Sequence, residues 1–227
     1  MIYITGDIHG DINRFNVKKL KKDDILIVCG DFGFIWDGGK KEEKLLKKLG
    51  KKKYSILFLD GTHENFDLLS KYPEVDFNGG KAQHICGNLY HLLRGEIYTI
   101  DDKKIFVFGG GESSEKQLRI EAGKWWNQEM PTGEEMENGL KNLSDNNMEV
   151  DYIITHEPAP RTMYNTVNPK DTTNQLEAYF EKLVKLVKFK KWFFGSIHID
   201  RKITATNYAL FEEVIPIEAP QRKRFRK

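Results

Sequence analysis

Two kinds of metal-binding side chain recur where short apolar runs of the sequence end in loops. The set consists of Asp7, His9, Asp31, His63, His156 and His198. A lone histidine is more often a satisfied structural residue, but four at equivalent positions, beside two Gly-Asp turns, are hard to explain by packing. Neutral imidazoles together with carboxylates suit Mn²⁺, Fe²⁺, Zn²⁺ or Ni²⁺ better than Ca²⁺. The pattern favours a metal or phosphate site, whereas His84 and His91 lie outside it and receive no role.

A site of this kind suits the hydrolysis of a phosphate ester. The ester is anionic and repels hydroxide, and a divalent cation neutralises its phosphoryl oxygens. The cation also lowers the pKa of a bound water, so that hydroxide exists near neutral pH. Glycines in the loops allow sharp turns and let the backbone approach the anion closely.

The elements that must position these residues alternate between strand and helix. Apolar runs typical of buried strands occupy 2–5, 25–29, 55–60, 104–108, 152–155 and 191–194. Helical patterns cover 11–22, 40–50, 131–143 and 172–189. Thr132 and Glu135 have the spacing of a capping box, and the stretch 88–110 resembles consecutive antiparallel strands that turn at Asp101 and Asp102. The alternation predicts a layered α/β fold, in which ligands bind at the carboxyl ends of strands.

The chain of 227 residues predicts one domain over 1–218 and a basic tail over 219–227. Lys and Arg total 36 against 34 Asp and Glu, so the net charge is only +2. That balance argues against the strongly basic field of a nucleic-acid-binding domain. The tail, which ends in "QRKRFRK", is interpreted as solvated and disordered in preference to a contact with nucleic acid or an anionic surface.

Cysteine usage and hydropathy favour a cytoplasmic location. Two unpatterned cysteines, Cys29 and Cys86, predict a reducing environment and no disulfide framework. The N-terminus meets acidic residues too early for a signal peptide. No apolar run approaches the roughly 20 residues of a membrane span, so we expect a cytoplasmic protein without membrane contact.

The motifs together resemble a known superfamily. The blocks "GDIHG", "GDFG", "GTHEN", "THEP" and "GSIH" occur in the order and approximate spacing of the calcineurin-like metallophosphoesterases, from Asp7 to His198. Any one block is weak, but the five together are specific. The chain is most similar to small bacterial and phage members, and it lacks the acidic-arginine motif that follows the second block in the protein Ser/Thr phosphatases. The resemblance implies a four-layer α/β/β/α sandwich of two mixed sheets flanked by helices.

The resemblance also implies two metal sites that share one aspartate. The ligands implied for the first metal are Asp7, His9 and His198. Asp31 would bridge to a second metal, which His156 would also hold. His63 would bind no metal, and would instead hydrogen-bond the phosphate or protonate the leaving oxygen.

Two positions depart from the family pattern, and both concern the second metal. Thr62 stands where the family has an asparagine ligand, and Ser196 stands where it has a histidine ligand. Neutral hydroxyls are poor ligands for such metals. We therefore expect one tightly bound metal and a second site that is weak or filled only with substrate.

Two further residues are candidate contacts to the second metal or the substrate, Glu64 and Arg94. Glu64 either orients His63 or, with Asn65, caps the start of a helix. Arg94 could bind phosphate in bidentate fashion, although a structural role is commoner for such an arginine.

The sequence thus predicts a metal-dependent phosphoesterase that hydrolyses a phosphodiester or a phosphomonoester. Mn²⁺ is the preferred ion, and the expected substrate is a small phosphoester or a nucleotide-type molecule. The alternative is a binding or scaffold protein on the same fold, resembling the retromer-type subunits of the superfamily. The loss of two ligands favours the scaffold, whereas the retention of His63, whose role is chemical, argues for the enzyme. Fold alone does not decide between them.

Overall fold

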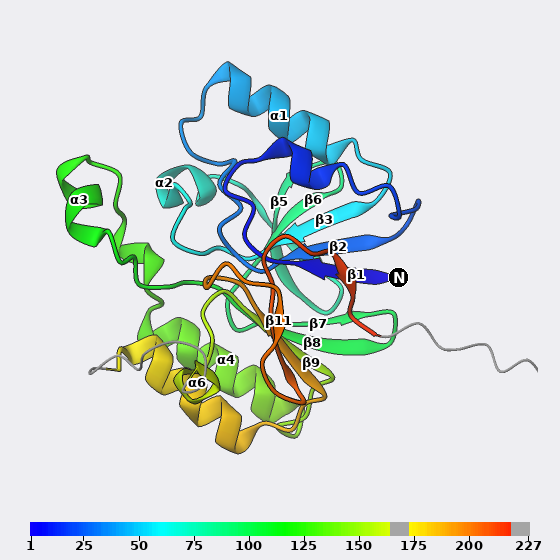
Figure 1. Cartoon of the computed structure of the whole chain (residues 1–227), viewed down its shortest axis with the longest axis vertical. Coiled ribbons are helices and arrows are strands. Elements are labelled where there is room, and N and C mark those ends of the chain that lie inside the picture. Colours follow the sequence, from blue (N-terminus) through cyan, green and yellow to red (C-terminus); the bar gives the residue numbers. More distant parts are fainter. Residues whose placement is uncertain (164–172, 219–227) are drawn as a thin grey trace, which may run out of the picture.

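Two β-sheets packed face to face form the centre of the fold in the computed structural model, which describes residues 1–163 and 173–218 (Figure 1). The seven-stranded sheet has the order β13-β1-β2-β3-β6-β5-β4. Its strands, in chain order, are β1 Ile2–Thr5, β2 Ile25–Val28, β3 Ser55–Phe58, β4 Glu74–Phe77, β5 Gly80–Cys86, β6 Leu89–Leu92 and β13 Ile215–Pro216. The six-stranded sheet has the order β11-β12-β10-β9-β8-β7. Its strands are β7 Ile97–Ile100, β8 Lys103–Phe108, β9 Tyr152–Thr155, β10 Lys191–Phe194, β11 Arg201–Lys202 and β12 Asn207–Ala209.

Both sheets are mixed, as predicted. In the first, β1, β2, β3 and β6 run parallel, while β13 and β5 pair antiparallel with this block and β4 pairs antiparallel with β5. In the second, β8, β9, β10 and β12 run parallel, with β7 and β11 antiparallel at the edges. The carboxyl ends of β1, β2 and β3 are therefore neighbours in one sheet, and those of β9 and β10 are neighbours in the other.

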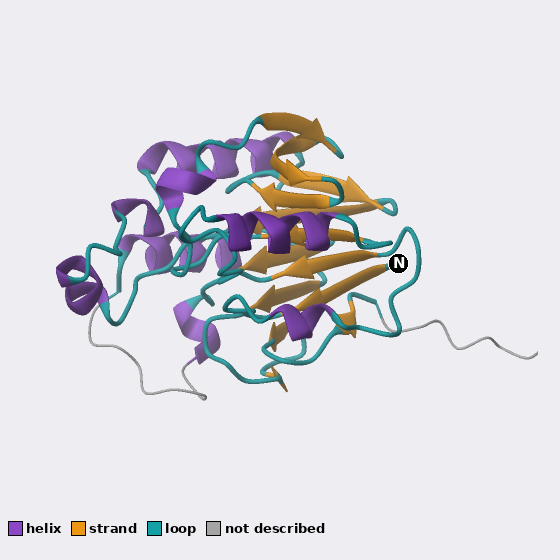
Figure 2. Ribbon diagram, turned by 90° about the horizontal axis from the view of Figure 1, so that it is seen from above, coloured by secondary structure: helices purple, strands orange, loops and turns teal. Residues whose placement is uncertain are grey.

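Three apolar layers hold the sheets and helices together. Along β1, Ile2 and Ile4 pack between the two sheets, whereas Tyr3 packs on the outer side, as expected for side chains that alternate across a strand. Helix α1 (Lys40–Gly50) covers the outer face of the first sheet and lies in front of the strands in Figure 2. Helices α4 (Gly133–Asp145) and α6 (Gln175–Leu186) cover the second sheet (Figure 1). The predicted four-layer sandwich is confirmed.

The helix termini follow from local side-chain hydrogen bonds. Thr132 and Glu135 form the predicted capping box at the start of α4. Asn174 and Glu177 form a second one, so α6 begins at Gln175 and not at 172. Each box satisfies backbone N–H groups that the first helical turn leaves without partners.

Two expectations for local structure are wrong. The predicted helix over 11–22 is only the 3₁₀ turn η1 (Ile12–Phe15), because the buried Phe15 and Leu20 do not share one helical face. Within 88–110, the hairpin of β7 and β8 at Asp101 and Asp102 is confirmed. However, β6 pairs with β3 in the opposite sheet.

The remaining helices are short: α2 Phe66–Leu69, α3 Lys116–Glu121, η2 Asn127–Glu129 and α5 Pro160–Met163. None of the helices in 1–163 and 173–218 is both long and apolar enough to cross a membrane. Cys29 and Cys86 are free thiols. The predicted basic tail, 219–227, lies outside the described residues.

Candidate metal centre

The predicted site residues meet at the carboxyl ends of five strands. The loops after β1, β2 and β3 supply Asp7, His9, Asp31 and His63, and those after β9 and β10 supply His156 and His198. Contacts of less than 4 Å connect all six side chains into one cluster. His84 and His91, to which the sequence assigns no role, lie outside this cluster and bond Gly87 and Gln83 instead.

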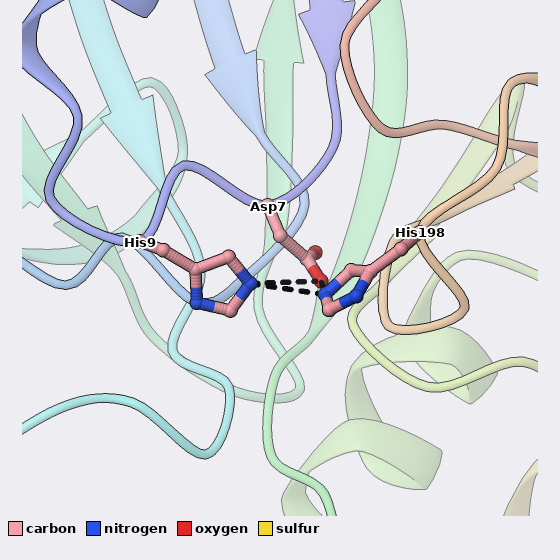
Figure 3. Close-up of side chains that lie close together, drawn as sticks. All are labelled: Asp7, His9 and His198. Carbon is pink, nitrogen blue, oxygen red and sulfur yellow. Dashed lines mark hydrogen bonds and ion pairs between the residues drawn. The ribbon is translucent and has the colours of Figure 1, made fainter.

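Asp7, His9 and His198 form the first part of the cluster (Figure 3). Nε2 of His198 lies 2.9 Å from Asp7 Oδ2 and 2.9 Å from His9 Nε2. Asp7 is fully buried, while the His9 and His198 side chains are 32% and 48% exposed. The two imidazole nitrogens therefore face one carboxylate oxygen on the solvent side. Two neutral imidazoles and a carboxylate are a donor set that fits a divalent transition metal.

Asp31 lies at the centre of the second part of the cluster and contacts its other members. Its Oδ2 lies 2.6 Å from His63 Nδ1 and 3.8 Å from His9 Nδ1. Its Oδ1 accepts hydrogen bonds from the backbone N–H groups of Thr62 and His63, at 2.6 and 2.9 Å. His156 Nε2 lies 3.6 Å from the same oxygen. The buried carboxylate of Asp31 thus touches both parts of the cluster, which is the position that a bridging ligand requires.

The buried His156 is held in one tautomer. Its Nδ1 makes a 3.1 Å hydrogen bond to the carbonyl oxygen of Cys29, and a carbonyl only accepts, so Nδ1 must carry the proton. Nε2 is then left to face Asp31. Such a backbone partner for the second ring nitrogen is typical of metal-binding histidines. Gly30 makes this packing feasible, since a Cβ atom there would lie 2.2 Å from His156 Nδ1.

The backbone of the site adopts the left-handed conformation at four residues that are not glycine. The φ angles are 49° at His9, 43° at Asp31, 62° at Ser196 and 52° at His198. This conformation costs on the order of 1–3 kcal/mol per residue and persists where surrounding contacts over-determine it, often at functional sites. Three of these four residues, His9, Asp31 and His198, belong to the cluster.

Neighbouring histidines favour the ionised form of both aspartates of the cluster. Burial opposes the ionisation of Asp31, but His156 and His63 outweigh it and hold the pKa of Asp31 well below its ordinary value. Burial likewise opposes the ionisation of Asp7, but His156 and His198 lower its pKa. The protein therefore presents two anionic carboxylates to whatever positive charge occupies the site.

The two departures from the family pattern lie at the cluster. Thr62 Oγ1 is 3.4 Å from Asp31 Oδ1 and 3.1 Å from His63 Nδ1. Ser196 donates its backbone N–H to both oxygens of Asp7, each at 3.1 Å. At both positions, therefore, the backbone N–H groups orient the carboxylates, while the side chains offer only a neutral hydroxyl.

Glu64 makes contacts that the sequence does not suggest. Its buried carboxylate accepts hydrogen bonds from the N–H groups of Phe32, Gly33 and Gly61, so it ties the loop after β2 to the loop after β3. Burial, with the charge of Asp31, raises the pKa of Glu64 to about 8. The helix start is capped by the neighbouring Asn65 alone.

Arg94 is engaged in a buried ion pair that the sequence does not reveal. Its Nε and Nη2 lie 2.9 and 2.5 Å from Asp60 Oδ2. Asp60 also contacts His91 at 3.1 Å, and Arg94 reaches Glu135 at 3.4 Å. The guanidinium is therefore committed to protein carboxylates, which leaves a structural role as the one that its contacts support.

Comparisons with known proteins identify the family of the chain. A search of curated proteins found no match. Among solved structures, the crystal structure of phosphopantetheinyl hydrolase (PptH) from Mycobacterium tuberculosis is similar at 15% sequence identity and a TM-score of 0.44, over 92% of this chain and 89% of that chain. The family model of calcineurin-like phosphoesterases matches residues 1–200. The chain therefore belongs to the calcineurin-like phosphoesterase family.

Proposed function

We propose that the protein is a metal-dependent phosphoesterase with a complete first metal site and a weakened second one. The observation that supports this most strongly is the convergence of Asp7, His9 and His198, whose ligand atoms lie within 4.8 Å of one another. These three residues would hold the first cation. Asp31 and His156 would hold the second, with Thr62 and Ser196 adding only hydroxyls.

A bound cation would neutralise phosphoryl oxygens and favour the ionisation of an attacking water. The protein's own residues would do the rest. His9 and His198 are exposed at the surface of the cluster, and the phosphoryl group would bind beside them. Water attacks phosphorus as the bond to the leaving oxygen breaks, and the leaving oxygen needs a proton.

His63 would supply that proton. Its Nδ1 is occupied by Asp31 at 2.6 Å, and its side chain is 42% exposed, which leaves Nε2 free to face a substrate. A carboxylate that holds one ring nitrogen orients the imidazole. His63 would therefore hydrogen-bond the phosphate or protonate the leaving oxygen.

A second candidate function, a scaffold without turnover, is favoured by the hydroxyls at Thr62 and Ser196. The two functions are separated by assaying the protein in Mn²⁺ against a nitrophenyl phosphodiester and a nitrophenyl phosphomonoester. Turnover that is lost on chelation and restored by Mn²⁺ supports the enzyme. A folded, metal-loaded protein without turnover on either ester supports the scaffold.

A further inference from the structure

An arm formed by residues 112–129 extends from the body between β8 and α4 and carries α3 and η2 (Figure 1). Its tip is exposed, with Leu118 66% accessible to solvent. Its base contacts the loop after β2, because Trp126 packs edge-on against Trp36 at 5.7 Å between ring centroids. The base also hydrogen-bonds the body through Trp126 Nε1, which donates to Asp67 at 2.8 Å.

One residue of the arm reaches the loop that carries His63. Arg119 lies on α3 among exposed neighbours but is itself buried. Its Nη1 lies 2.9 Å from Glu129 Oε1 and 3.2 Å from Ser113 Oγ. Its Nη2 donates a 2.5 Å hydrogen bond to the carbonyl oxygen of Thr62. The guanidinium therefore joins a buried carboxylate of the arm to the backbone beside His63.

That carbonyl belongs to the peptide group between Thr62 and His63. The N–H of the same peptide group donates to Asp31 Oδ1 at 2.9 Å. Because a peptide group is planar, a cation on its oxygen and a carboxylate on its N–H fix the whole plane. Each charged partner also polarises the group, which strengthens the hydrogen bond at the other end. Arg119 and Asp31 therefore hold one peptide plane from its two ends.

We propose that Arg119 is a positioning residue for the reaction, which acts by fixing the peptide plane from which the His63 side chain projects. The inference rests on the proposed phosphoesterase function. Without the guanidinium, only Asp31 holds this peptide group, so the plane can tilt and shift the imidazole of His63. Misplacement of a reacting group by about 1 Å can cost about 100-fold in rate.

The test compares Arg119→Lys with a matched control, Lys116→Gln. The lysine keeps a positive charge near the buried Glu129, but it lacks the planar fork with which two nitrogens of Arg119 bond Glu129 and Thr62. Lys116 lies on the same helix, and its ammonium lies over the Trp125 ring at 4.5 Å, so its loss removes a charge from the arm without touching the His63 loop.

Both substitutions are made in the wild-type and in the His63→Ala background, and kcat is measured at equal metal content. We expect Arg119→Lys to lower kcat by about 10- to 100-fold in the wild type, and by less than about 3-fold in His63→Ala, because residues that act as a unit are not additive. Lys116→Gln should have little effect in either. An equal loss in both backgrounds, or no loss in the wild type, overturns the proposal.

A spectroscopic measurement tests the role of Arg119 independently of turnover. If the wild type hydrolyses no ester, the proposed function is refuted, but this measurement still tests whether Arg119 positions His63. Long-range ¹H–¹⁵N spectra of the Zn²⁺-bound protein report the imidazole nitrogens, and the signal absent from His63→Ala identifies His63. We expect that signal to shift in Arg119→Lys and to stay in place in Lys116→Gln, with both variants folded by thermal unfolding. An unchanged His63 signal in a folded Arg119→Lys protein overturns the inference.

Discussion

The replacement of His63 by alanine separates catalysis from metal binding. His63 has Nδ1 on Asp31 and Nε2 toward solvent, and it is not one of the three residues that would hold the first metal. General acid help contributes about 10²–10⁴ in rate, which corresponds to roughly 3–5 kcal/mol of transition-state stabilisation. We therefore expect His63→Ala to keep its metal and to lose about 10²–10⁴ in kcat.

The assay pairs elemental analysis of the purified protein with steady-state kinetics on two esters that differ in their leaving group. If His63 protonates the leaving oxygen, the loss should be larger for an alkyl ester, whose alkoxide leaves poorly, than for a nitrophenyl ester. His84→Ala is the matched control, since His84 is also half-buried but contacts the Gly87 carbonyl and the Tyr90 ring, outside the cluster. It should leave both metal content and rate unchanged.

One alternative is built into the geometry of the cluster. His63 Nδ1, His9 Nδ1 and Asp31 Oδ2 also lie within 4.8 Å of one another, so His63 could itself be a ligand. In that case His63→Ala would lose metal in proportion to its lost activity. That result would refute the assignment of His63 to proton transfer.

Three further variants give separate predictions. His198→Ala should empty the first site in elemental analysis and abolish turnover, because it removes one of three ligands. Ser196→His combined with Thr62→Asn should raise the bound metal toward two per chain, because it adds strong donors to a site with two fixed ligands. Asp60→Asn should lower the free energy of unfolding in urea by about 3–5 kcal/mol at pH 7, because it leaves the buried Arg94 without its carboxylate partner.

Each of these has a result that contradicts it. Full metal occupancy in His198→Ala would show that the first site does not need this imidazole. Two tightly bound ions in the wild type would contradict the weak second site. For Asp60, the control is Asp145→Asn, whose exposed partner Lys141 should make the change no larger than about 1 kcal/mol. Equal effects of the two aspartate substitutions would disprove the importance of the buried pair.

The Asp60 pair also predicts a pH dependence. Burial opposes the ionisation of Asp60, but Arg94 and His91 outweigh it and hold its pKa well below the ordinary value near 4. A depressed pKa in the folded state means that the contribution to stability is complete above about pH 4 and is lost as the pH falls below it. The difference in stability between wild type and Asp60→Asn should therefore shrink below about pH 4.

Much of the site could be predicted because its residues follow a local rule. Asp7 and Asp31 each come directly after an apolar run and a glycine, and parallel neighbours end at one edge of a sheet. The position of Asp7 and Asp31 at this edge of the sheet could therefore be predicted without knowing the order of the strands. The same reasoning places His156 and His198 at the ends of β9 and β10, which the structure pairs.

The residues that escaped prediction depend on contacts between distant segments. Arg119 stands in "KQLRIE", which reads locally as an exposed helix, and only the fold brings it to Thr62. Arg94 and Asp60 are 34 residues apart and meet because β6 pairs with β3. That pairing is itself invisible in the pattern of 88–110, since an apolar run does not specify which neighbour it hydrogen-bonds. The 3₁₀ turn η1 was also not predicted from the sequence. The packing of the core, and not helical spacing, decides the burial of Phe15 and Leu20.

The most direct test of the central claim measures metal content and turnover on the same sample. The purified protein is stripped with a chelator, titrated with Mn²⁺, and assayed on the nitrophenyl phosphodiester and phosphomonoester at each step. Our account predicts that turnover on at least one ester rises from zero as the first equivalent of Mn²⁺ binds, and that His198→Ala shows neither the binding nor the rate. A wild-type protein that binds Mn²⁺ fully and hydrolyses neither ester, or one that hydrolyses an ester equally well without metal, would contradict it.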